Sequence, residues 1–418
     1  MRTFSRFLSL LSYTALVATV AEPLAAQPKT RQLGPIIAAS TDTLSVRVAV
    51  RPMSNGKVLV NDITRQRLLL FDAKLSSPQV VMDSGANNAN AAMPVAIASA
   101  QLIPFTADSS LYVDIATQAL LVLGPDGKVG HVMALPRPRD AIYMAIGAIY
   151  GTPAVDPKGR LVYRGVIPPT PVRNPDGAAP GFSIPQQPDS SPIVRADFDS
   201  RTIDTLIRVK ALNPGQMTIN PDKEGNMVMK IVINPLDTGD EWAMLADGTI
   251  AIVRAHDYHV DFLDPDGTHR SASKMPFDWK RLTDEQKQFK IDSIKPVMEK
   301  QLDAQRASLP TIPTPNGPRK LLPQFEFVPL NKIADYEPPI SPGSVRADLD
   351  NNLWIVPRTT IGGGTGGLIY DVVNRKGELI DRVQFPKGRA LVGFGPDGVV
   401  YMVNANEKTA FLERAKLR

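Results

Sequence analysis

Short apolar runs that begin at a tight turn recur along most of the chain. In each run, one or two turn-forming residues precede three or four mainly apolar positions, which is the pattern of a buried strand. The six runs are Asn55–Val60, Asp108–Val113, Pro157–Tyr163, Asp247–Ile252, Asp350–Ile355 and Pro396–Tyr401. Measured from Gly56, Ser109, Gly159, Gly248, Asn351 and Gly398, the spacings are 53, 50, 89, 103 and 47 residues. The three similar spacings predict a repeated unit, and the two long ones predict insertions.

A second strand and a second turn follow most of these runs. The segments are Leu68–Asp72, Leu120–Gly127, Val260–Gly267 and Leu368–Gly377, and two of them end in Pro-Asp-Gly. Proline presets φ at such a turn, aspartate caps it and glycine supplies the left-handed position. Each unit is therefore predicted to be an antiparallel meander. A small sheet of this kind cannot bury both faces alone, so we expect an all-β fold in which six sheets stack radially as a six-bladed β-propeller.

The end of the chain suggests how the ring closes. The last unit supplies strands near 391–394, 399–403 and 409–416 and is then one strand short of a blade. Residues 43–50 alternate apolar and polar positions near the start of the chain. We expect this segment to pair with the last blade as its missing edge strand, because an open sheet edge is a liability.

Two insertions are expected to interrupt the ring. Residues 166–192 contain eight prolines and predict an extended surface loop. Residues 275–340 predict a helical insertion, because Thr283 and Gln286 match a capping box, with a break or kink at Pro296.

The repeated strand, the Pro-Asp-Gly turn and the set of six units resemble the six-bladed β-propeller group that includes NHL-repeat, TolB-like and lactonase-type propellers. The resemblance covers essentially all of the chain after its first segment. Its motifs concern turns and core positions, so it implies a fold and says little about function, and no characterised branch is a close match.

The first segment has the features of a secretory signal peptide. Arg2 and Arg6 precede a mostly apolar run from Phe7 to Val20, and small residues stand just before Gln27. The alternative is a membrane anchor, but the run falls short of the roughly 20 residues that span a bilayer. We expect a signal peptide at 1–26, a linker at 27–42 and the propeller at 43–418.

Composition narrows the setting and the partners. The 418 residues include no cysteine, which excludes disulfides, thiolate metal sites and cysteine nucleophiles, and suits a bacterial periplasm or secreted protein held by its core alone. The net charge of +5 is too small to suggest nucleic-acid binding. No later segment is long enough to span a membrane, so we expect no membrane insertion after signal cleavage. We also expect the protein to be a monomer.

One set of polar residues recurs just after the six repeated strands. The set is Asp62, Asp114, Arg164, Arg254, Arg358 and Asn404. Corresponding residues of a propeller can converge at one mouth of its channel, where three arginines would bind a carboxylate or phosphate. The alternative is a set of structural ion pairs between neighbouring blades, such as Asp114 with Arg164.

Other motifs are weaker. We expect no cofactor: lactonase-type propellers hold a metal in the channel with carboxylates and Asn, but arginine at half of the recurring positions disfavours calcium. His256 and His259 have a spacing that puts them on opposite faces of a strand, which is poor for joint chelation. No Gly-x-Ser-x-Gly occurs, and the glycine run 362–367 lacks the lysine of a phosphate loop.

Two functions remain open at this point. The first is an exported binding or scaffold module for a small anionic ligand or a protein partner, without catalysis. The alternative is a hydrolase or lyase at the channel mouth, with Arg164, Arg254 and Arg358 stabilising an oxyanion and Asp62 or Asp114 as the base.

Overall fold

A computed structural model describes residues 28–83, 101–115, 117–146, 150–166, 182–183, 188–212, 217–222, 226–305, 311–312, 317, 319–360, 366–406 and 408–417. The expected signal peptide, most of the proline-rich segment and most of the glycine run lie outside these residues. In the described part of the chain, no helix has the length and apolar character needed to cross a membrane.

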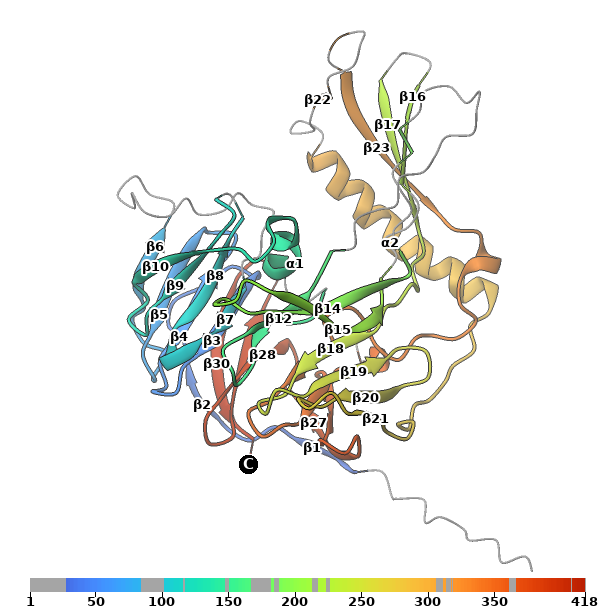
Figure 1. The fold of residues 1–418 in the computed structure, drawn as a ribbon. Coiled ribbons are helices and arrows are strands. Elements are labelled where there is room, and N and C mark those ends of the chain that lie inside the picture. Colours follow the sequence, from blue (N-terminus) through green and yellow to red (C-terminus); the bar gives the residue numbers. More distant parts are fainter. Residues whose placement is uncertain are drawn as a thin grey trace, which may run out of the picture.

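Six antiparallel sheets form the ring and confirm the six-bladed β-propeller (Figure 1). Blade 1 contains β3 (Val48–Pro52), β4 (Val58–Asp62), β5 (Arg67–Phe71) and β6 (Gln79–Asp83). Blade 2 contains β7 (Leu102–Pro104), β8 (Ser110–Asp114), β9 (Ala119–Leu123) and β10 (Val129–Ala134). Blade 3 contains β11 (Ala154–Val155), β12 (Leu161–Arg164), β14 (Ser190–Ala196) and β15 (Ile203–Lys210).

The second half of the ring follows the same plan. Blade 4 contains β18 (Glu241–Met244), β19 (Ile250–Arg254), β20 (His259–Leu263) and β21 (His269–Ser271). Blade 5 contains β24 (Val345–Ala347), β25 (Leu353–Ile355), β26 (Ile369–Val373) and β27 (Leu379–Gln384). Blade 6 contains β28 (Arg389–Gly395), β29 (Val399–Ala405), β30 (Ala410–Lys416) and β2 (Ile36–Ala39).

In each blade, the strand that comes first in the sequence is the innermost one. First strands of neighbouring blades contact each other, as β28 does with β3 and β18 with β24. The six repeated runs found in the sequence are therefore the second strands, one position out from the axis.

Apolar side chains fill each of the six gaps between blades. On β4, Val58 and Val60 pack against Tyr401 of blade 6, whereas Leu59 between them packs against Tyr112 of blade 2. The same alternation on the other second strands gives six clusters, one for each pair of neighbouring blades. Because a fully buried large apolar side chain contributes about 1.5–3 kcal/mol, these clusters carry most of the stability of the ring.

The ring closes through the N-terminal part of the chain, but not through the segment that the sequence suggested. The edge strand of blade 6 is β2, which pairs antiparallel with β30. Within 43–50, Leu44 forms an isolated bridge with Ala410, and Val48 already begins β3, the innermost strand of blade 1. The prediction that 43–50 closes the ring is thus wrong in its residues, although an N-terminal strand does complete the last blade.

The expected linker at 27–42 is also wrong, because it holds two strands of the ring. Besides β2, it contains β1 (Thr30–Gln32), which adds to blade 5 in parallel with β27. Arg31 fixes β1 in place: its Nε donates to Asp381 Oδ2 at 2.8 Å and its Nη1 donates to the Leu417 carbonyl at 2.7 Å.

The two faces of the ring differ in their connections. The turns from first to second strand and from third to fourth strand are short, and we call the face that carries them the tight-turn face. Gly127 and Gly267 take φ of 78° and 90° at its Pro-Asp-Gly turns, as predicted. All long connections emerge on the opposite side, the insertion face, including η2 (Pro138–Asp140) with α1 (Ala141–Ile146) and η6 (Arg358–Thr360).

A separate cap rises from the insertion face beside blades 3 to 5 (Figure 1). Its sheet contains β13 (Phe182–Ser183), β16 (Met217–Pro221), β17 (Met227–Ile233), β22 (Thr311–Ile312) and β23 (Arg319–Phe327). Its helix is α2 (Asp284–Gln305), which runs through Pro296 rather than breaking there. The capping box is confirmed, since Thr283 N donates to Gln286 Oε1 at 2.9 Å and Gln286 N to Thr283 Oγ1 at 3.3 Å.

The cap was only partly predicted. The helix of 275–340 was expected, but β22, β23 and the strand pair at 217–233 were not. Leu236, Ile291 and Ile333 form its buried centre, and they come from three segments that are distant in the sequence.

Deletion of residues 28–40 tests the closing role of β1 and β2. We expect the melting temperature to fall by roughly 5 °C or more relative to a chain that lacks only residues 1–27, because blade 6 and blade 5 each lose an edge strand. Thermal unfolding followed by circular dichroism measures this, and equal melting temperatures for the two truncations would contradict it.

Candidate functional site on the insertion face

The six recurring polar residues lie at the insertion-face ends of the second strands. Asp62, Asp114, Arg164 and Arg254 end β4, β8, β12 and β19, Asn404 lies near the end of β29, and Arg358 begins η6 after β25. These residues were expected to converge at one mouth of the channel, but the channel is lined by the first strands, one strand further in. A ring that lines the channel is therefore not what the structure shows, and a role of these residues in ligand binding stays a prediction.

Three of the six have structural contacts within their own blade or next to it. Asp62 accepts from Arg67 Nε at 3.0 Å and from the Ser45 backbone N–H at 3.1 Å. Asp114 accepts from the Thr117 hydroxyl at 2.6 Å. Asn404 donates to Glu413, at 3.0 Å, and Glu413 also pairs with an arginine of the same blade. The inter-blade ion pair of Asp114 with Arg164, which was the example for the structural alternative, is not found among the described residues.

Arg358 occupies a different environment, under the cap. Its backbone N–H donates to the Pro339 carbonyl at 2.8 Å, and its buried Nε has no hydrogen-bond partner. Burial lowers the pKa of this guanidinium, and nearby Glu337 partly offsets the shift.

Arg164 and Arg254 are brought together around a pair of acids that the sequence analysis missed. Arg254 Nη1 lies 2.7 Å from Asp240 Oδ2, and its Nε lies 2.7 Å from an oxygen of Asp261. Arg164 Nε donates to the Ser191 hydroxyl, and its positive charge acts on the neighbouring Glu241.

Asp240 joins the ends of two blades. Its Oδ2 also accepts from the Lys210 backbone N–H at 2.9 Å, at the end of β15, and its Oδ1 accepts from Ala255 N at 3.3 Å. The carboxylate therefore has partners on blade 3 and on blade 4 and holds the two arginine-bearing segments in fixed positions.

Glu241 is the first residue of an innermost strand and is only 4% exposed. One of its oxygens accepts from the Gly343 backbone N–H at 2.9 Å. Burial raises the pKa of Glu241 to about 8, with the Gly343 N–H and Arg164 opposing the shift. Near neutral pH this side chain is thus expected to be a buried neutral acid, an unusual state for a glutamate.

A cleft of about 820 Å³ lies next to this cluster, between the ring and the cap. Its walls include Lys210, Ala255 and His256 from the ring and Lys332, Asp335 and Tyr336 from the cap segment. Trp279 and Tyr336 are 40% and 47% exposed there. We call this space the ring–cap cleft. Of the two histidines, His256 lines it, while both ring nitrogens of His259 are held by Asp257 and Asp261.

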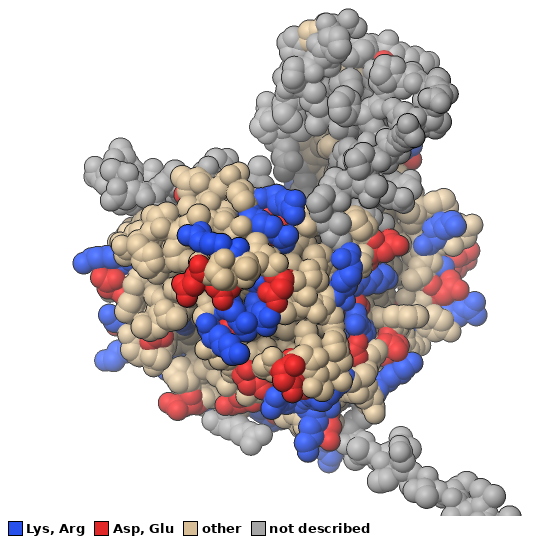
Figure 2. Space-filling view, viewed as in Figure 1, with Lys and Arg blue, Asp and Glu red and all other residues tan. Residues whose placement is uncertain are grey.

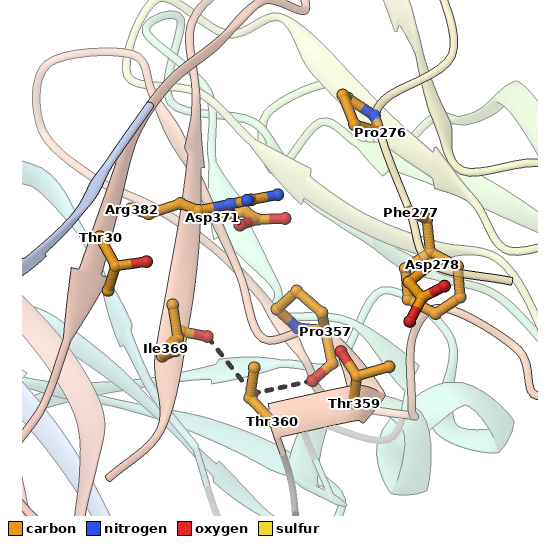
Figure 3. Close-up of a pocket in the computed structure, with 10 residues that line it drawn as sticks. All are labelled: Thr30, Pro276, Phe277, Asp278, Pro357, Thr359, Thr360, Ile369, Asp371 and Arg382. Atoms are coloured by element: carbon orange, nitrogen blue, oxygen red, sulfur yellow. Dashed lines mark hydrogen bonds and ion pairs between the residues drawn. The ribbon is translucent and has the colours of Figure 1, made fainter. Parts of the chain in front are cut away.

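A second cavity, of about 450 Å³, lies between blades 4 and 5 (Figure 3). Asp371 and Arg382 lie side by side in it, with Phe277 and Asp278 on the facing wall. Arg382 Nε donates to Asp371 Oδ1 at 2.9 Å, and the Tyr258 hydroxyl of blade 4 donates to Asp371 Oδ2, also at 2.9 Å. Burial raises the pKa of Asp371. Because its oxygens already accept from both blades, we read this cavity as an inter-blade contact.

Charges of both signs lie close together elsewhere on the ring. Figure 2 shows Lys and Arg beside Asp and Glu over the visible face, rather than a face of one sign. Within the described ranges, no three His, Cys, Asp or Glu side chains are grouped as a metal site requires.

Substitution Glu241→Gln tests the buried neutral acid. The unfolded chain releases this proton near pH 4.5 and the native protein holds it to about pH 8. Wild-type stability should therefore decrease in that window, by up to about 1.4 kcal/mol per pH unit, and the variant should lack this loss. The melting temperature of the variant relative to wild type should rise between pH 5 and pH 8. A difference in melting temperature that stays constant with pH would contradict the assignment, and the exposed Glu299→Gln serves as the comparison variant.

Substitution Tyr258→Phe tests the inter-blade contact. It leaves Asp371 without one donor, so we expect a loss of about 1–3 kcal/mol in the free energy of unfolding measured by urea. Tyr143→Phe is the matched control, since its hydroxyl forms no hydrogen bond with another described residue. Equal effects of the two substitutions would show that the contact does not stabilise the ring.

No protein-family model matches the chain, and no curated protein is similar to it in sequence. Solved structures with a similar fold include a gluconolactonase from Xanthomonas campestris, with 10% identity, a TM-score of 0.39 and coverage of 92% of this chain and 99% of that one. Virginiamycin B lyase from Staphylococcus aureus has 10% identity, a TM-score of 0.39 and coverage of 93% and 97%. Regucalcin, a calcium-binding protein from Agrobacterium tumefaciens, has 11% identity, a TM-score of 0.39 and coverage of 92% and 97%. The chain is a six-bladed propeller with lactonase-type structural neighbours and no close characterised match, and similarity at this level identifies no activity.

Proposed function

We propose that this protein binds a small anionic molecule in the ring–cap cleft. The observation that carries the proposal is the composition of the cleft: exposed aromatic rings and lysine side chains face one large space on the insertion face. Ligand sites in proteins combine such apolar surfaces with a few charged groups that orient the ligand.

Two lysine side chains of the cleft have no acidic partner among the residues that the structure describes. Lys210 and Lys332 line it and form no ion pair within the described part of the chain. Two carboxylates of the cleft are already paired, because Asp257 lies 3.2 Å from Lys274 Nζ and Asp335 lies 2.7 Å from Lys287 Nζ. An anionic ligand would thus find two ammonium groups that form no ion pair among the described residues, with Asp237 as the third carboxylate of the lining.

The aromatic residues suggest a ring-bearing ligand. Trp279 and Tyr336 expose large flat surfaces in the same cleft, where a sugar or aromatic ring can pack and lose contact with water. An acidic sugar combines this apolar face with a carboxylate. The ring residues behind the cleft, Arg254 and Asp240, would keep Lys210 in place through its backbone.

A hydrolase or lyase acting at the same end of the ring is the second candidate. Glu241 supports it, since a protonated carboxylic acid next to Arg164 combines a proton donor with a group that stabilises negative charge. In this second candidate function the acid–base residue is Glu241, and not Asp62 or Asp114 as the sequence suggested. Turnover of a bound ligand separates the enzyme from the binding module.

Secretion or location in the periplasm is part of the proposal. It rests on the leader-like residues 1–26 and on the absence of cysteine from the sequence. A ligand of this module would then be one that occurs outside the cytoplasm.

A thermal-shift screen with acidic sugars, phosphoesters, lactones and divalent metals tests the site. We expect an acidic sugar to raise the melting temperature of the wild type, and Lys210→Gln with Lys332→Gln to weaken that ligand at least tenfold, since both free ammonium groups are lost. Lys295→Gln, an exposed lysine on α2, is the control and should bind as the wild type does. The anionic site would be ruled out if an uncharged sugar raised the melting temperature as much as the acidic sugar does. It would also be ruled out if the acidic sugar raised the melting temperature of the double variant as much as that of the wild type. Product formation from the stabilising compound would favour the enzyme.

A further inference from the structure

A third cavity lies on the axis of the ring, toward the tight-turn face. It has a volume of about 460 Å³, and residues of all six innermost strands line it. Its charged lining residues are Arg51, Arg346 and Asp108, while most of the others are apolar. We call it the axial cavity.

Arg51 and Arg346 occupy the same level of the ring. Arg51 pairs across its sheet with Leu59 and stands two residues before the Met53–Lys57 turn. Arg346 pairs with Trp354 and stands two residues before the Asp348–Asn352 turn. The corresponding positions of blades 2, 3 and 4, opposite Leu111, Val162 and Ala251, carry Ile103, Ala154 and Ala243.

The two arginines differ in their partners. Arg51 Nη2 lies 3.6 Å from Asp108 Oδ1, a residue of the neighbouring blade, and its Nη1 donates to the Pro52 carbonyl, but its buried Nε has no partner. The side chain of Arg346 makes no hydrogen bond or ion pair among the described residues. Asp397 of blade 6 stands at the turn position that Asp108 occupies in blade 2. It is exposed and forms no ion pair with Arg346.

An unpaired guanidinium in such a cavity is costly. Burial lowers the pKa of both arginines, because the charged form of a guanidinium loses hydration in the cavity wall. Both arginines are half-buried in the cavity wall, and one carboxylate for two guanidinium groups leaves one positive charge in excess there. An anion would supply the partner that Arg346 lacks, because guanidinium groups bind planar or tetrahedral oxygen anions through two parallel hydrogen bonds.

We propose that the axial cavity binds a small oxygen anion, a carboxylate or a phosphate, through Arg346 with Arg51 at the same level. Access is from the tight-turn face, where Leu349 at the rim is 55% exposed. The site is independent of the ring–cap cleft, which opens on the insertion face, so either site can exist without the other.

Binding of phosphate, sulfate and malonate to the full chain tests this site by calorimetry, with sodium chloride at equal ionic strength as the reference. We expect at least one of the three to bind, and the comparison of phosphate with malonate decides between a phosphate and a carboxylate. Arg346→Gln should weaken that binding at least tenfold. Lys376→Gln, an exposed lysine in a turn of the same face, is the matched control and should bind as the wild type does.

The stability of the variant gives a second readout. Because Arg346 has no partner, Arg346→Gln should leave the melting temperature without anion unchanged or raised, and should abolish the increase that the anion causes in the wild type. Arg346→Lys keeps the charge but loses the forked geometry, so it should bind the anion more weakly than the wild type does. It replaces Arg346→Gln as the test variant if the glutamine variant does not fold. No binding of any of the three anions, or equal binding by the wild type and by both Arg346 variants, would overturn the proposal.

Discussion

The need to cover both faces of every blade governs this structure. A four-stranded sheet with apolar residues on two sides is stable only between two neighbours, so the ring must close, and six separate clusters such as Leu59 with Tyr112 form only then. Closure depends on β2, a strand of four residues from the other end of the chain, with Leu44 and Ala410 joined beside it. Arg31 anchors the adjoining strand β1 to Asp381 and Leu417. A short N-terminal segment thus holds two blades in register.

The direction of the innermost strands determines which face of the ring carries the insertions and the candidate functional residues. All six run from the insertion face to the tight-turn face, so every connection between blades, and every turn from second to third strand, emerges on the insertion face. The cap, α1 and the Asp240–Glu241 pair all lie there for this reason. The tight-turn face keeps short turns, which leaves the axial cavity and Arg346 accessible from that side.

Local turn chemistry explains what the sequence predicted well. Pro-Asp-Gly at 125–127 and 265–267 determines a turn within three residues, so the number of blades followed from counting turns. The closing strand could not be found in the same way, because residues 43–50 alternate as an innermost strand does, and only long-range pairing decides between the two. Asp240, Glu241 and Arg346 were missed because the innermost strands are short and follow long connections rather than recognisable turns. The six polar residues were found because they follow the regular second strands, but their partners, such as Asp240 for Arg254, are set by the fold.

The distribution of partners separates arginines that hold the ring together from those that remain free to act. Arg67, Arg254, Arg382 and Arg389 each contact a carboxylate of their own blade at about hydrogen-bond distance, so their charge is already used in fixing the ends of strands. An additional anion would have to compete with those carboxylates. At Arg346 there is no such competitor among the described residues, and the surrounding apolar side chains strengthen any electrostatic contact relative to one in water. The net charge of the chain says nothing about this difference, which depends on whether a carboxylate on the neighbouring strand lies within reach.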